Sequence, residues 1–336
     1  MLRRMLIISL VLLVILAVGW ASLRRADIPF DTLESIYTSN TSRFMTLENG
    51  LKLHYRDEGQ PEGRALVLVH GFSASLHTWE SWVDRLGADY RIISLDLPGH
   101  GLTRSPDPDD IGIDLFVEAV AGATEKLGVE RFVLVGNSMG GNTAWQFART
   151  HGERLEGLVL VAASGWRNEA EDGDRPFAFR LLANPFARWL MKDIDITGLV
   201  RSGLQDSFAD PSLATPAMVA RYVDLARAPG HRESILALLV QRDERAEATP
   251  GRLSMISVPT LVLQGQEDRV VAPSGAPKFA DAISGAELRL YPGVGHLPQE
   301  EAVDATITDL TEFLDRRIWL TNEQVEDTPQ PVLEPG

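Results

Sequence analysis

The sequence predicts an α/β fold in which helices cover both faces of a mostly parallel sheet and a helical cap is inserted between two strands. Short, nearly continuous apolar runs alternate with helical stretches, as expected for strands that are buried on both faces. This alternation stops between residues 166 and 252 and resumes afterwards. A mostly parallel sheet with one long helical insertion accounts for both observations.

The predicted core covers residues 40–165 and 253–317. Residues 43–56 are typical of a hairpin, because Asn49-Gly50 tolerates the positive φ angles of a tight turn. The final element is predicted to be one helix over residues 300–317, with an apolar face at Val303, Ile307, Leu310 and Leu314. The six predicted core strands are Ala65–Val69, Arg91–Leu95, Phe132–Val135, Leu158–Ala162, Thr260–Leu263 and Glu287–Tyr291.

The predicted cap, residues 166–252, consists of short helices separated by proline and glycine. Its first helical stretch carries apolar side chains with basic residues among them. This set either packs against the sheet and lines an acyl pocket, or forms a basic amphipathic helix that touches lipid. Residues 318–336 are acidic and rich in proline, so we expect a disordered tail. The apolar set is Phe177, Phe179, Leu181, Leu182, Phe186, Trp189 and Leu190.

An uncharged apolar segment, residues 5–23, begins the chain between two pairs of arginines. A membrane-spanning helix needs about 20 apolar residues, so residues 1–25 are predicted to be an uncleaved anchor. The alternatives are a cleaved signal segment with its small residues at Gly19 and Ala21, or a buried helix. An anchor would leave a single amino-terminal pass with the main domain outside the cytoplasm, and cleavage would leave a secreted or periplasmic protein.

Composition excludes several classes of function. The formal net charge of −15 gives no basic surface for nucleic acid. The chain has no cysteine, which excludes disulfides, thiol catalysis and zinc–thiolate sites. No cluster of metal ligands or cofactor motif is recognisable, so we expect neither a metal nor an organic cofactor. The oligomeric state is left open.

A Gly-x-Ser-x-Gly motif, Gly136-Asn137-Ser138-Met139-Gly140, follows the predicted strand at Phe132 and precedes a helical stretch. The motif alone is suggestive, and its position between a strand and a helix carries the argument. The glycines permit the close packing of a sharp turn that holds a serine in a strained conformation. Ser138 is therefore the predicted nucleophile.

A serine hydroxyl needs a neighbouring base, which a carboxylate holds in the correct tautomer. His296 follows the last predicted strand, and Asp268 follows the strand before it. Loops at the carboxyl ends of parallel strands meet at one edge of the sheet, so His296 is the predicted base and Asp268 its partner. His54, His77, His100, His151 and His231 are interpreted as structural or solvated, and Glu267 as a solvated loop charge.

An oxyanion hole needs two backbone N–H donors. The amide of Met139, directly after the predicted nucleophile, is one candidate. The amide of Phe72 is the other, because His70-Gly71-Phe72 ends a buried strand.

These motifs together resemble the α/β-hydrolase superfamily over residues 40–317. They are the His-Gly-Phe loop, the Asp-Leu-Pro-Gly-His-Gly turn from Asp96 to Gly101, the Gly-Asn-Ser-Met-Gly-Gly elbow, the Asp268 loop and the Gly-His loop, in that order. The chain is similar to bacterial carboxylesterases and lipases with an amino-terminal hydrophobic segment. It also resembles the hydrolases of meta-cleavage products, but Leu297 and the His70–Ser75 loop depart from their aromatic residue and glycine-rich loop.

The resemblance implies hydrolysis of carboxylic esters through an acyl-enzyme, with a small-molecule ester or a lipid-like compound as substrate. The alternatives are a hydrolase of carbon–carbon, amide or lactone bonds on the same triad, and a cofactor-free haloperoxidase-like or non-enzymatic protein. An aspartate would stand at Ser138 in epoxide hydrolases and haloalkane dehalogenases, which argues against those reactions.

Overall fold

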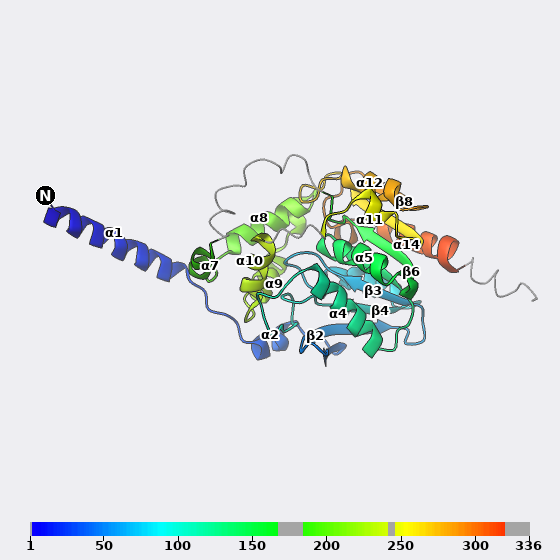
Figure 1. Ribbon diagram of the computed structural model, residues 1–336, viewed down its shortest axis with the longest axis horizontal. Helices are drawn as coiled ribbons and strands as arrows, with labels where there is room; N and C mark the ends of the chain where they lie inside the picture. The colour runs from blue at the N-terminus through cyan, green and yellow to red at the C-terminus, as the bar shows by residue number, and fades with distance from the viewer. Residues whose placement is uncertain (1, 167–183, 241–245, 320–336) are drawn as a thin grey trace, which may run out of the picture.

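Eight strands form one sheet in the order β1-β2-β4-β3-β5-β6-β7-β8 (Figure 1). The computed structural model describes residues 2–166, 184–240 and 246–319. The β1–β2 and β2–β4 pairs are antiparallel and all other pairs are parallel, so the predicted mostly parallel α/β sheet is confirmed. The strands are β1 (Ser42–Thr46), β2 (Lys52–Gly59), β3 (Ala65–Val69), β4 (Arg91–Leu95), β5 (Phe132–Asn137), β6 (Leu155–Val161), β7 (Thr260–Gly265) and β8 (Glu287–Tyr291).

Helices cover both faces of this sheet. Alternate side chains of β3 point to opposite faces, with Leu66 and Leu68 in one apolar cluster and Val67 and Val69 in the other. The continuous apolar runs in the sequence therefore reflect burial on both sides. On the Leu66 side lie α3 (Glu80–Leu86) and α14 (Val303–Leu314); on the Val67 side lie α4 (Ile113–Lys126), α5 (Met139–Thr150) and α12 (Gly275–Ala282).

Two local predictions differ from the structure. The hairpin turn runs from Leu47 to Leu51, and only Gly50, at φ 83°, has the positive φ expected of both turn residues. The predicted final helix is broken at Ala302, whose φ of −127° and ψ of 49° separate α13 (Pro298–Glu301) from α14. The carboxylate of Glu301 is then free to bind backbone amides outside its own helix, as described below.

A short helix that the sequence patterns did not reveal, α2 (Phe30–Tyr37), precedes β1. Its Leu33 is fully buried in a small apolar cluster with Leu102, Leu225 and Ala228. The segment before the predicted core therefore packs against both the core and the insertion.

The described part of the insertion consists of α7 (Pro185–Met191), α8 (Thr197–Ser207), α9 (Pro216–Ala226) and α10 (His231–Val240). Residues 167–183, with Phe177 to Leu182 of the predicted apolar set, lie outside the described residues. Phe186 and Trp189 are 69% and 59% exposed, so of the two alternatives for this apolar set, packing against the sheet domain does not hold at these two positions. The helix α11 (Pro250–Leu253) crosses the predicted boundary between cap and core, and its Leu253, the first residue of the predicted core, is buried in the core cluster beside α5 and α12.

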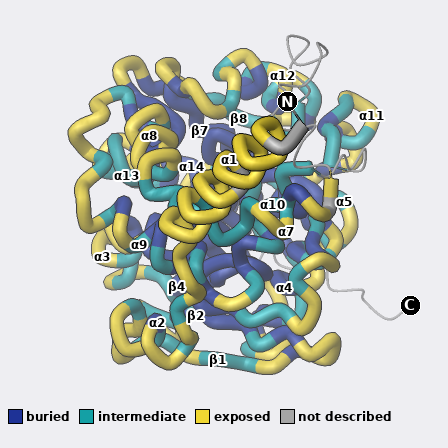
Figure 2. The backbone as a smooth tube through the Cα atoms, turned by 90° about the vertical axis from the view of Figure 1, so that its left-hand side faces the viewer, coloured by how far each residue is buried: buried dark blue, intermediate teal, exposed yellow. Residues whose placement is uncertain are grey.

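The helix α1 (Leu2–Leu23) projects from the rest of the molecule and is exposed along its length (Figures 1 and 2). Within it, residues 4–23 are long and apolar enough to cross a membrane. The predicted buried-helix alternative is therefore wrong, because this segment makes no buried core.

At the other end, the predicted disordered tail begins too early. Ile318 and Trp319 belong to a π-helical turn, Asp315–Trp319, and both are buried in the core cluster on the α14 side. The Trp319 ring lies 5.1 Å from that of Tyr90. The rest of the predicted tail, from residue 320, lies outside the described residues.

Candidate active site

Ser138 occupies a sharp turn between β5 and α5. Its φ of 55° and ψ of −116° are strained for a residue with a side chain. The turn needs glycine on both sides, because a Cβ on Gly136 would lie 2.1 Å from the Gly140 oxygen, and one on Gly140 would lie 2.3 Å from the Val69 oxygen. The Ser138 amide donates to the Val161 oxygen at 3.0 Å, which ties the turn to β6.

His296 and Asp268 come together at the same edge of the sheet. The Nδ1 of His296 lies 2.8 Å from Oδ2 of Asp268, and both residues are buried. Asp268 also accepts hydrogen bonds from the amides of Val270 and Val271 at 2.8 and 2.9 Å and from Nε2 of Gln264 at 2.9 Å. These donors hold the carboxylate facing His296, and an Nδ1–H that donates to it leaves Nε2 free to accept a proton.

The backbone of the cap contacts the loop that carries His296. The His296 amide donates to the Ser207 oxygen at 2.7 Å, and a Cβ on Gly295 would lie 2.6 Å from that same oxygen. The loop that carries His296 is thus hydrogen-bonded to the backbone of the cap. The sequence patterns did not indicate this contact.

Glu301 strengthens this contact. Its Oε2 accepts from the amide of Gly295 at 2.6 Å and from that of Ala209 at 3.2 Å, while Oε1 accepts from the amide of Asp210 at 3.0 Å. One carboxylate therefore joins the cap to the residue before His296. Sequence reasoning missed Glu301, because nothing in a pair of consecutive glutamates reveals contacts about ninety residues away.

Glu267 has a structural contact as well. Its Oε2 accepts from the Val294 amide at 3.1 Å, and its own amide donates to the Val294 oxygen. Glu267 is exposed, as the interpretation of a solvated loop charge expects, and it also braces the loop that leads to His296.

The predicted oxyanion loop lies against Ser138. A Cβ on Gly71 would be 3.0 Å from the Ser138 Cβ, so a larger residue would crowd the serine turn. Ser73, just beyond Phe72, has a φ of 58°, which marks a sharp turn. Among the hydrogen bonds of the described residues, neither the Phe72 nor the Met139 amide is a donor. Both N–H groups thus have no acceptor in the described part of the chain, as an oxyanion hole requires.

A buried carboxylate, Asp96, organises the loops beside this site. It binds Nδ1 of His54 at 2.6 Å and accepts from the amides of Leu76 and Leu102, both at 2.8 Å. Burial alone would raise the pKa of Asp96, but His54 and the other nearby histidines outweigh it and hold that pKa far below its ordinary value. Asp96 therefore stays ionised and joins β2, through His54, to the segments that contain Leu76 and Leu102.

The histidines near Asp96 are structural and buried. His70 accepts from the Leu97 amide at 2.9 Å, and burial lowers its pKa. Burial likewise lowers the pKa of His100 to about 3. His231 was expected to be solvated, but it is buried with ring nitrogens 2.9 Å from the oxygens of Leu225 and Thr103, and burial lowers its pKa.

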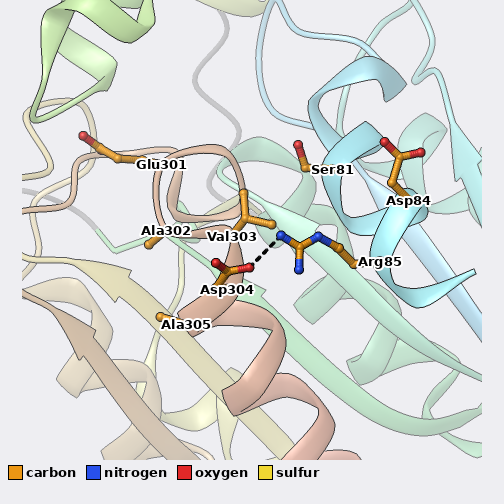
Figure 3. Close-up of a pocket in the computed structure, with 8 residues that line it drawn as sticks. All are labelled: Ser81, Asp84, Arg85, Glu301, Ala302, Val303, Asp304 and Ala305. Carbon is orange, nitrogen blue, oxygen red and sulfur yellow. Dashed lines mark ion pairs between the residues drawn. The ribbon is translucent and has the colours of Figure 1, made fainter.

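A surface hollow of about 430 Å³ lies between α3 and the α13–α14 region (Figure 3). An ion pair of 2.9 Å between Arg85 and Asp304 crosses it, while Glu301 points away from that pair. Ser138, Asp268 and His296 do not line this hollow, so it is separate from the predicted triad. Across the described residues, no three histidine, aspartate or glutamate side chains gather in a way that could hold a metal.

The parallel sheet, the strained serine turn and the paired aspartate and histidine define a hydrolase of the α/β type. A family model described as alpha/beta hydrolase fold matches residues 64–303, and the chain belongs to this family. The predicted fold and superfamily are thereby confirmed.

The chain is similar to several known hydrolases in sequence and in structure. The chain is 29% identical over 287 residues to a 2-hydroxy-6-oxononadienedioate/2-hydroxy-6-oxononatrienedioate hydrolase of Comamonas testosteroni, covering 81% of this chain and 96% of that protein. It superposes on the crystal structure of a hydrolase from Pseudomonas aeruginosa with a TM-score of 0.68 and 26% identity, covering 82% of this chain and 99% of that one. The fold also matches a membrane phospholipase A, with a TM-score of 0.66 and 24% identity, over 93% of this chain and 98% of that one.

Proposed function

We propose that this protein is a serine hydrolase that cleaves carboxylic esters through an acyl-enzyme. The observation that carries the proposal is the buried His296–Asp268 pair, 2.8 Å apart, in the loops that flank the strained Ser138 turn. A serine in this position becomes an effective nucleophile when a correctly oriented imidazole takes its proton.

The reaction follows from these groups. Ser138 Oγ attacks the acyl carbon while His296 Nε2 takes its proton, and the carbonyl oxygen becomes an anion that accepts hydrogen bonds from the Phe72 and Met139 amides. The tetrahedral adduct then expels the alcohol, to which His296 returns the proton. Water attacks the acyl-serine by the same steps, which releases the acid and restores Ser138. Asp268 stabilises the imidazolium and stays ionised throughout.

Hydrolysis of a carbon–carbon bond is the second candidate. It is favoured by the relatives, among which the Comamonas testosteroni protein is named as a hydrolase of 2-hydroxy-6-oxononadienedioate and 2-hydroxy-6-oxononatrienedioate. Leu297 after His296, and Phe72, Ser73 and Ala74 after Gly71, depart from the pattern of that group, which is why esters are placed first. A fold that hosts many reactions gives no further preference.

Substrate panels separate the two candidates. We expect purified protein to hydrolyse p-nitrophenyl esters of graded acyl length and to leave the absorbance of a 2-hydroxy-6-oxo-hexadienoate unchanged. Rapid bleaching of the dienoate with little ester hydrolysis would replace the ester assignment by the carbon–carbon one.

Three substitutions test the triad. Ser138→Ala, His296→Ala and Asp268→Asn should each lower kcat on the best ester by about 10⁴-fold, as loss of a triad member does elsewhere. Asp304→Ala is the control, because its ion pair with Arg85 is at the surface and away from the triad. Wild-type turnover by Ser138→Ala would refute the assignment, whereas an active Asp268→Asn would only move the role of the acid.

We further propose that α1 anchors the enzyme in a membrane with the catalytic domain outside the cytoplasm. The proposal is supported by a helix of spanning length in which none of the residues with a described exposure is buried. Activity should pellet with membranes, resist high salt and be released by detergent. External protease should remove the domain from spheroplasts. Recovery of a soluble protein that begins near Ser22 would show that the segment is a cleaved signal instead.

A further inference from the structure

The chain that leaves α1 is bound to the cap as a short antiparallel pair. The amide of Asp195 donates to the Leu23 oxygen at 2.9 Å, and the amide of Arg25 donates to the Asp193 oxygen at 2.7 Å. Ion pairs join the same segments, with Arg25 3.0 Å from Asp195 and Arg24 bonded to Asp193. The exit from α1 is thus fixed to the cap by backbone and side-chain bonds together.

The attachment continues through the next residues. The Arg227 guanidinium donates twice to the Ala26 oxygen, at 3.0 and 2.8 Å, and the amide of Ile28 donates to the Arg227 oxygen at 2.8 Å. Arg232, whose side chain is only 5% exposed, bonds to Asp27 and to the Arg25 oxygen. A buried cation paired in this way holds residues 23–28 on the cap, so α1 cannot rotate freely relative to it.

An exposed apolar face lies where α1 ends. The Trp20 indole N–H donates to the Leu190 oxygen at 2.7 Å, which brings α7 beside the last turns of α1 (Figure 1). On α7, Phe186 and Trp189 are 69% and 59% exposed, and their rings stack 5.9 Å apart. Leu190 is 36% exposed. We call Phe186, Trp189 and Leu190 the α7 face.

We propose that the α7 face inserts into the surface of the lipid bilayer that α1 spans, so that the cap rests on the membrane. This inference rests on the proposed anchor. Aromatic side chains favour the boundary between headgroups and acyl chains, and a short amphipathic helix lies in that plane. The fixed attachment at residues 23–28 keeps the α7 face at the level where α1 leaves the hydrocarbon. A bilayer is therefore the occupant that the position of this face favours.

The absence of cysteine from the chain allows the test to be done on the full protein. Trp189→Cys and Met255→Cys are labelled separately with an environment-sensitive fluorophore and reconstituted into vesicles of phosphatidylethanolamine and phosphatidylglycerol. Met255 is the matched control, since it is 61% exposed but lies on the core after α11. We expect the probe at position 189 to shift to the blue and to be quenched at least twofold by a lipid with a shallow nitroxide, and the probe at position 255 to be quenched by aqueous iodide alone.

Equal iodide quenching at both positions would overturn the proposal. Protection from iodide without quenching by lipid would also overturn it, and would indicate a second copy of the chain on the α7 face if dilution reversed the protection. A third variant, Leu12→Cys, tests the anchor by itself through a nitroxide placed deep in the acyl chains. Deep quenching at position 12 without shallow quenching at position 189 would retain the anchor and reject the role of the α7 face.

Discussion

Glu301→Ala is the substitution that best tests the link between the cap and the predicted base. Glu301 accepts hydrogen bonds from the amides of Gly295, Ala209 and Asp210 at 2.6, 3.2 and 3.0 Å. Only the Gly295 amide belongs to a buried residue, and a buried N–H that loses its acceptor costs about 1–3 kcal/mol. Water can replace the carboxylate at the other two amides. We therefore expect a loss of about 1–3 kcal/mol in the free energy of unfolding.

The same change should affect catalysis more than binding. Gly295 directly precedes His296, and a displacement of about 1 Å in a catalytic group lowers rates by up to 10²-fold. We expect kcat per folded molecule to fall about tenfold or more, with a smaller change in KM. Glu301→Gln should lose less of both, because its single carbonyl oxygen can still accept from the Gly295 and Ala209 amides, and its NH₂ group faces only the exposed Asp210 amide.

Urea unfolding and initial rates on the best ester measure these two effects. Asp304→Ala is again the control, because it lines the same hollow as Glu301 and its surface ion pair contributes about 0–1 kcal/mol (Figure 3). Wild-type kcat per folded molecule in Glu301→Ala would refute the positioning role, even if the variant were less stable.

Two further predictions concern stability. Gly101→Ala should destabilise the fold by about 3 kcal/mol or more, because the φ of Gly101 is 55° and the new Cβ would lie 2.0 Å from the Asp96 carboxyl. Gly128→Ala is the control and should lose only about 1 kcal/mol, because its φ is 66° but its Cβ would point into open space. Equal losses of the two variants in urea unfolding would contradict the steric argument. Burial raises the pKa of Glu300 to about 7. The Thr78 hydrogen bond and Arg221 lower this pKa, and Glu80 raises it further. The folded state therefore holds the Glu300 proton more tightly than the unfolded state. Wild-type stability should then fall relative to Glu300→Gln as the pH rises from about 4.5 to about 7, and parallel pH profiles of unfolding for the two proteins would contradict this assignment.

The strands were predictable because burial on both faces of the sheet requires an apolar side chain at nearly every position. In β3, successive side chains enter opposite apolar clusters, so the whole run Ala65–Val69 must be apolar. The last helix was only half predictable. Its apolar positions at Leu310 and Leu314 identify the correct face, but the pattern carries no information about the break at Ala302. The α7 face shows the opposite case, since its apolar pattern left burial and lipid contact as alternatives, and only the structure shows that these residues are exposed beside α1.

The candidate site also has a part that the sequence predicts and a part that it does not. Ser138, Asp268 and His296 follow three parallel strands, and the geometry of such a sheet brings their loops to one edge whatever the rest of the chain does. The bond from His296 to Ser207 depends instead on how the cap docks, which local pattern does not encode. Because this bond and the Glu301 carboxylate both join the cap to the two residues 295 and 296, the cap is part of what positions the predicted base. The cap segment 207–210 therefore holds the backbone of Gly295 and His296, from which the side chain of the predicted base projects.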